Sequence, residues 1–176
     1  MKAQWVTAGV AAMMLAAGSP ATAKALTFKA ALSGQTPSTM TGSKATGRAT
    51  VQVDTETQAV SVMLDVKGLS VDQLSAGLRK APMGPIHLHV YASQSHGAKD
   101  DADLLFPLPY GPTYAPTADG FTVTVKDAPF APAAKLVNSK SSFDDFVAAL
   151  QAGRIVLNIH TNAQPDGEIS GDVVPA

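Results

Sequence analysis

His87 and His89 have the residue type and the spacing of two metal ligands on one β-strand. They lie in segment 85–91, where apolar residues alternate with polar or aromatic ones. Because successive side chains of a strand point to opposite faces, both imidazole rings lie on the face opposite the aliphatic residues. At a rise of about 3.3 Å per residue their Cα atoms are about 6.5 Å apart, which lets both rings bind one ion.

His160 has the same relation to the strand predicted over 154–161. The aliphatic residues of that segment occupy alternate positions on the core face, so His160 projects from the other face. If the two histidine strands are neighbours in the sheet, three imidazole rings meet at one place. Three nitrogen ligands favour copper or zinc, since magnesium and calcium prefer oxygen. We therefore expect a copper or zinc site formed by His87, His89 and His160.

Two further residues are candidates for additional ligands. His96 follows the first pair closely, and the thioether of Met83 would offer a soft axial ligand to copper. Asp100, Asp101 and Asp103 offer oxygen ligands suited to calcium, but a short acidic run in a loop is usually solvated. Each histidine also has a metal-free interpretation as a hydrogen-bonded strand residue, because histidine has many roles besides metal binding.

Composition excludes several classes of function. The chain has 176 residues with 13 Lys+Arg, 14 Asp+Glu and a formal net charge of -1. Nucleic-acid binding needs clustered basic residues, so nucleic acid is not an expected partner. The sequence has no cysteine, which excludes disulfides, thiolate zinc sites and iron–sulfur clusters. It also lacks a Gly-x-Ser-x-Gly nucleophile motif, so an enzyme is not the first expectation. The alternative to a metal-binding module is a metal-free module that binds a protein or a glycan.

The elements that must position the histidines are mainly strands. Alternation with a period of two predicts strands at 26–32, 48–53, 60–66, 86–91, 121–125, 155–159 and 169–174. Many short strands with turn residues between them predict an all-β fold, an antiparallel Greek-key-like β-sandwich or partly closed barrel.

One helix and one long loop interrupt these strands. Apolar residues at i, i+3, i+4 and i+7 from Phe143 predict a helix over about 142–152, with Ser142 as its N-cap. The segment at about 92–119 has no periodicity and contains four prolines. It therefore predicts a long loop, either a lid over a site or a plain insertion.

The N-terminus has the pattern of a cleavable signal peptide over residues 1–23. Lys2 precedes an uncharged apolar run that is shorter than the roughly 18 residues needed to span a membrane. Small residues then allow cleavage after Ala23 or Ala25. We expect a single domain over 24–176 that is periplasmic or secreted, with no membrane span after cleavage.

Several segments resemble the CHRD (chordin-type) domain family. The most specific is the closing pair of segments, 153–161 and 162–171; others are 28–34, 66–69 and 86–89. The resemblance covers nearly all of residues 26–174. It implies an extracytoplasmic all-β module, of a kind found in animal chordin and in many bacterial exported proteins.

A weaker similarity concerns the histidines alone. A His-x-His strand, a late Gly-Arg strand that ends in histidine and a following Asp-Gly turn resemble the copper-ligand pattern of Cu,Zn superoxide dismutases. This similarity implies that His87, His89 and His160 are copper ligands, and it adds a dismutase-like redox enzyme as a further alternative. The chain departs from the pattern because His96 follows His89 too closely to match the bridging histidine.

Overall fold

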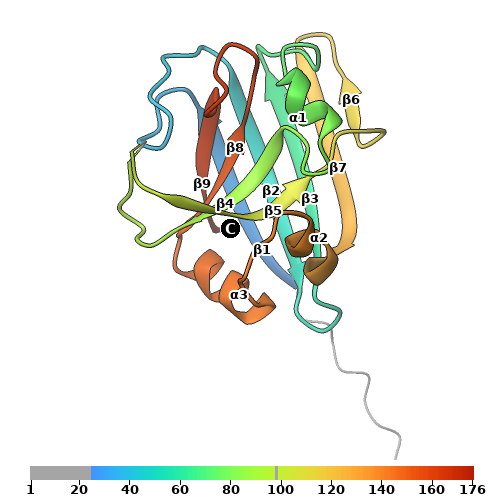
Figure 1. Cartoon of the computed structure of the whole chain (residues 1–176), viewed down its shortest axis with the longest axis vertical. Helices are drawn as coiled ribbons and strands as arrows, with labels where there is room; N and C mark the ends of the chain where they lie inside the picture. The colour runs from blue at the N-terminus through green and yellow to red at the C-terminus, as the bar shows by residue number, and fades with distance from the viewer. Residues whose placement is uncertain (1–24, 98) are drawn as a thin grey trace, which may run out of the picture.

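The computed structural model describes residues 25–97 and 99–176, so the predicted signal peptide lies outside the described residues. Within these ranges, nine strands form one sheet whose neighbouring strands are all antiparallel, in the order β5-β4-β8-β9-β1-β2-β3-β7-β6 (Figure 1). The strands are β1 (Ala25–Ser33), β2 (Thr46–Asp54), β3 (Ala59–Lys67), β4 (Ile86–Tyr91), β5 (Ala102–Leu108), β6 (Tyr114–Pro116), β7 (Gly120–Pro129), β8 (Ile155–Ile159) and β9 (Ile169–Pro175). The predicted all-β antiparallel fold is confirmed.

The core lies on one face of this sheet. Alternate residues of the central strands are buried there; Val51 and Val53 on β2 and Val60 and Val62 on β3 are all 0% exposed. The intervening residues of β2 are mostly exposed. The alternation in sequence therefore follows the alternation in burial, as expected for a strand with one wet face.

The sheet curls until its two outermost strands approach each other. The Tyr114 hydroxyl on β6 donates a hydrogen bond of 2.6 Å to the carbonyl oxygen of Leu108, the last residue of β5. Helix α2 (Phe130–Leu136) contacts both β5 and β7. Side-chain contacts therefore connect the two edge strands, β5 and β6, which do not pair with each other through backbone hydrogen bonds.

The described part of the chain also forms three short helices, which lie at the ends of the curled sheet (Figure 1). The predicted helix is confirmed as α3 (Phe143–Gln151), where the Ser142 and Asp145 side chains form a reciprocal capping box. Helices α1 (Ala76–Lys80) and α2 were not predicted, because neither is long enough to show a helical period in sequence. Among the described residues, no helix is long and apolar enough to cross a membrane.

The prediction of one long loop over about 92–119 is wrong. The segment contains β5, which pairs with β4, and β6, which pairs with β7. The prolines misled the interpretation: Pro107 lies within β5, an outermost strand, where one side of the backbone needs no ladder hydrogen bond. The segment therefore builds both margins of the sheet and is not a lid.

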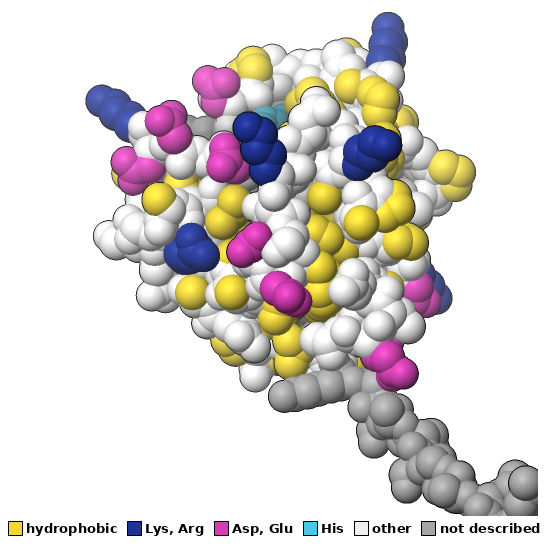
Figure 2. Space-filling model, turned by 60° about the horizontal axis from the view of Figure 1, so that its bottom comes forward, with side chains coloured by type: hydrophobic (Ala, Val, Ile, Leu, Met, Phe, Trp, Pro, Cys, Tyr) yellow, Lys and Arg dark blue, Asp and Glu magenta, His cyan; other side chains and the backbone are white. Residues whose placement is uncertain are grey.

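The face that carries α2 and α3 is turned forward in Figure 2, where apolar side chains lie between scattered charged ones. An open pocket of about 530 Å³ there is lined by Phe130, Ala134 and Phe143, among others. Neither the two histidines of β4 nor His160, which follows β8, lines this pocket.

We expect Tyr114→Phe to lower the free energy of unfolding by about 1–2 kcal/mol, because the buried Leu108 carbonyl loses its donor. Urea unfolding of wild type and variant measures the change. Tyr110→Phe, at a tyrosine that is 37% exposed, is the matched control and should change stability little. Equal effects of the two substitutions would contradict the role given to the Tyr114 hydroxyl.

Candidate metal centre

Strand pairing brings the three histidines to one place. Strands β4 and β8 are antiparallel neighbours, with His87 opposite Asn158 and His89 opposite Val156. The backbone N–H of His160 continues this ladder by donating to the Pro85 carbonyl at 2.9 Å. Residues paired in this register share a face, so all three imidazole rings lie on the same side of the sheet.

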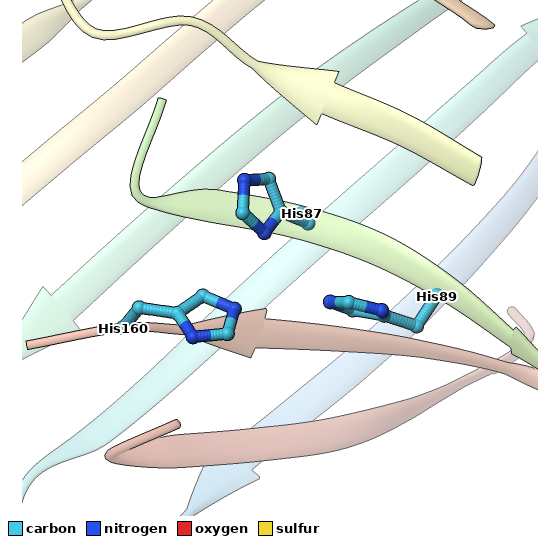
Figure 3. A group of neighbouring side chains, drawn as sticks. All are labelled: His87, His89 and His160. Carbon is cyan, nitrogen blue, oxygen red and sulfur yellow. The ribbon is translucent and has the colours of Figure 1, made fainter. Parts of the chain in front are cut away.

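The three rings face one another, as Figure 3 shows. The ring centroids of His87 and His89 are 5.6 Å apart, those of His87 and His160 4.9 Å, and those of His89 and His160 6.0 Å. One nitrogen from each ring lies within 4.8 Å of the other two. Two nitrogens bound to one ion at ~2.1 Å are at most ~4.2 Å apart, so the rings need to close by roughly an ångström to coordinate it.

Two of the three histidines are nearly as buried as the core residues of these strands, and His89 is half-buried. Ile86 and Leu88 on the core side are 0% exposed, while His87 is 3% and His160 8% exposed. The segment before α1 lies beside the end of the β8 strand, since the Ser75 N–H donates to the His160 carbonyl at 3.0 Å. Sequence alternation predicted the face on which the rings lie, but it did not predict their burial.

Backbone carbonyls fix which nitrogen of two rings carries the hydrogen. His87 Nε2 lies 2.7 Å from the Gly84 carbonyl oxygen, and His160 Nδ1 lies 2.7 Å from the Pro165 carbonyl oxygen. A carbonyl oxygen only accepts, so these two nitrogens donate. The opposite nitrogens of the neutral rings, Nδ1 of His87 and Nε2 of His160, therefore hold free lone pairs.

These two nitrogens and Nε2 of His89 have no hydrogen-bond partner among the described residues, although all three are buried. Buried polar atoms without a partner are uncommon in folded proteins. A metal ion would be a partner for all three nitrogens, with His89 in the tautomer that leaves its Nε2 without a hydrogen. Donation of the second ring nitrogen to a carbonyl is also the usual arrangement around metal-bound histidines.

Burial keeps the three rings uncharged. Burial, with a contribution from the neighbouring His160, lowers the pKa of His87 to about 4. Burial, with contributions from His87 and His160, lowers the pKa of His89 to about 3. Burial also lowers the pKa of His160, although its hydrogen bond to Pro165 acts in the other direction. The neutral form that binds metal is therefore the form present near pH 7.

The structure places the additional ligand candidates differently. His96 lies in another cluster, where its ring stacks on Tyr91 at a centroid distance of 4.0 Å and its Nε2 lies 3.3 Å from Asp172 Oδ1. It is not part of the three-histidine group. The Met83 backbone accepts a hydrogen bond that raises the pKa of His87, and a ligand role for the Met83 sulfur stays a prediction. Asp100 accepts from the Gly97 N–H at 2.7 Å and so orders its own loop.

Sequence reasoning missed Asn158 and the use of the turn after β8. Asn158 lies two residues before His160 on the same face, and its Nδ2 donates to the Asp166 carbonyl at 3.2 Å. Gly167 packs on it so closely that a Cβ there would lie 2.4 Å from Asn158 Oδ1. The turn that supplies the Pro165 carbonyl to His160 is thus held in place by Asn158. Asn158 could have been identified from sequence, because the alternation of β8 places it on the same face as His160.

Comparisons with known proteins bear on the whole domain. Residues 28–173 match the family model described as the CHRD domain. No curated protein and no solved structure matches the chain. The similarity of the histidine pattern to Cu,Zn superoxide dismutases therefore has no support from these comparisons.

We expect the metal-free protein to lose stability as the pH falls from about 6.5 toward 4. Unfolded histidines bind protons near pH 6.5, whereas folded His87 and His89 stay neutral to about pH 4 and 3. The unfolded state therefore binds more protons in this window, and each such histidine destabilises the fold by about 2 kcal/mol between pH 7 and pH 5. Urea unfolding with a chelator at both pH values measures this loss.

The comparison variant for the pH experiment is His89→Gln, which cannot take up the proton. Its stability should fall less between pH 7 and pH 5 than that of the wild type. An identical pH dependence in the two proteins would show that His89 titrates normally and is not desolvated.

Proposed function

Because the chain belongs to the CHRD domain family, we propose that it is a CHRD module that binds one copper or zinc ion. The ligands are Nδ1 of His87, Nε2 of His89 and Nε2 of His160. One observation supports the proposal above all: each of the three rings has a nitrogen within 4.8 Å of the other two rings, and the three proposed ligand nitrogens are buried without a hydrogen-bond partner among the described residues.

The ligand set suits binding more than chemistry on an organic substrate. Three imidazole nitrogens are good ligands for copper and zinc, and their neutral form needs no proton release near pH 7. The pockets of about 530 Å³ beside α2 and about 400 Å³ beside Tyr91 and Arg154 are lined by none of the three histidines. The histidine group is therefore separate from these two pockets, which are the size of sites for organic ligands.

A structural role without metal is the competing explanation for the cluster. Each buried nitrogen without a partner would then cost about 1–3 kcal/mol of stability. The fold would be destabilised by this amount at each of three neighbouring nitrogens, because no described group donates to them. Binding of a cation removes the cost, which favours the metal-binding interpretation.

Metal analysis of the purified protein tests the proposal. After loading with Cu²⁺ or Zn²⁺ and removal of free ions, we expect about one ion per chain in the wild type. His89→Gln should lose most of the metal, because two ligands bind far more weakly than three. His96→Gln is the matched control and should keep it, since His96 lies outside the group.

Equal and substoichiometric metal in the wild type, His89→Gln and His96→Gln would overturn the proposal. Circular dichroism of each variant shows that lost metal does not reflect lost folding.

We also propose that the module acts outside the cytoplasm. The basic residue, the apolar run and the small residues before Ala23 support export and cleavage. The described domain begins at Ala25 in β1, so cleavage after Ala23 or Ala25 leaves the paired part of the sheet essentially intact.

Expression in a bacterium with a secretion pathway tests this proposal. The mass of the protein recovered from the cytoplasm and from outside it shows where the chain is found and at which residue it starts. We expect a chain that starts at Lys24 or Leu26, found outside the cytoplasm. A full-length chain that stays in the cytoplasm would contradict it.

A further inference from the structure

The charge of the ligand set limits which ion the histidine site holds best. All three ligand nitrogens belong to neutral rings, so they do not reduce the charge of a bound ion. Among the described residues, no Asp or Glu belongs to the group. A divalent ion at this place would keep both of its charges.

The nearest acidic residues do not supply the missing negative charge from inside the protein. Asp166 acts on His160 from an exposed position, where water screens its charge. The Glu168 carboxylate accepts from the Thr161 hydroxyl at 2.9 Å and is only half-buried. The side chain directly opposite His87 in the sheet is Asn158, which is uncharged.

Burial makes this lack of charge important. The cost of moving an ion from water into a protein interior rises with the square of its charge, so it is about four times larger for a divalent than for a univalent ion. His87 and His160 are 3% and 8% exposed, and their ligand nitrogens are fully covered. A univalent ion is therefore favoured at this place relative to a divalent ion of similar ligand preference.

Ligand number favours the same ion. Zinc normally takes four ligands, and the described group offers three. Copper in its univalent state is satisfied by two or three ligands and accepts imidazole nitrogen. Other common univalent cations prefer oxygen. The chain also has no cysteine, so no thiolate elsewhere on it competes for univalent copper.

We propose that the site formed by His87, His89 and His160 is a Cu(I) site, which binds cuprous copper more tightly than Cu(II) or Zn(II). This inference rests on the proposed metal-binding function and names the ion and the oxidation state that the site selects. It predicts a preference at equilibrium and needs no reaction of the protein itself.

Competition for each ion tests the preference. The metal-free protein is titrated against bicinchoninate under anaerobic, reducing conditions for Cu(I), and against nitrilotriacetate in air for Cu(II) and Zn(II). We expect a dissociation constant at least tenfold lower for Cu(I) than for Cu(II) or Zn(II). A Cu(II) or Zn(II) constant equal to or below that for Cu(I) would overturn the inference.

Asn158 offers a way to change the charge without changing the three ligands. Asn158→Asp places a carboxylate of nearly the same shape opposite His87. It should raise the affinity for Zn(II) relative to Cu(I) at least tenfold. Asn158→Leu removes the same hydrogen bond to Asp166 without adding charge, so the Zn(II)-to-Cu(I) affinity ratio of Asn158→Asp should also exceed that of Asn158→Leu at least tenfold.

The outcomes distinguish the metal-binding function from the preference for Cu(I). Failure of the wild type to bind any of the three ions would overturn the metal-binding function itself. Stoichiometric binding with a divalent preference, or a ratio unmoved in folded Asn158→Asp, would overturn only the Cu(I) assignment. If the Asn158 variants do not fold, the wild-type constants alone decide the matter.

Discussion

The antiparallel register between β4 and β8 is the constraint on which the histidine site depends. It sets His87 opposite Asn158 and brings His160 to the end of the same ladder. A slip of one residue would turn every side chain of one strand to the other face, which would put part of the histidine group into the aliphatic core. The buried residues on the core face oppose that slip, because Ile86, Leu88 and Leu157 would then leave the core.

Two turns next to these strands determine the tautomers of His87 and His160. The Gly84 carbonyl faces His87, and Gly84 itself has φ of 72° and lies where a Cβ would be 2.3 Å from the Leu108 carbonyl oxygen. The second turn places the Pro165 carbonyl oxygen next to His160 Nδ1. The hydrogen bond from Asn158 Nδ2 to the Asp166 carbonyl holds this turn in place. A side chain on the first turn would displace the carbonyl that selects the ring tautomer. Residues outside the three-histidine group therefore decide which nitrogen of His87 and of His160 has a free lone pair.

Much of this arrangement follows from local sequence, but not all of it. Alternation correctly assigned the core face of β8 and the face of each histidine, because a period of two is a property of every strand. That β4 and β8 are neighbours could not be predicted from sequence, since 63 residues lie between Tyr91 and Ile155 and the pairing is decided by the whole sheet. Strand β5 was not predicted because it contains Pro107, and proline is unfavourable in a strand except at the edge of a sheet. The ring tautomers depend on carbonyls in turns, which have no period at all.

The bond between Tyr114 and Leu108 has a consequence for local opening of the sheet. Strand β4, which carries two of the three histidines, has only β5 between itself and the margin. Leu108 is the last residue of β5, so the bond ties β5 to the opposite edge strand and limits how far β5 can move away from β4. Transient exposure of the three imidazole rings to solvent is thus governed in part by a residue of the opposite edge strand, and the rate at which the rings exchange protons with water depends on the bond between Tyr114 and Leu108.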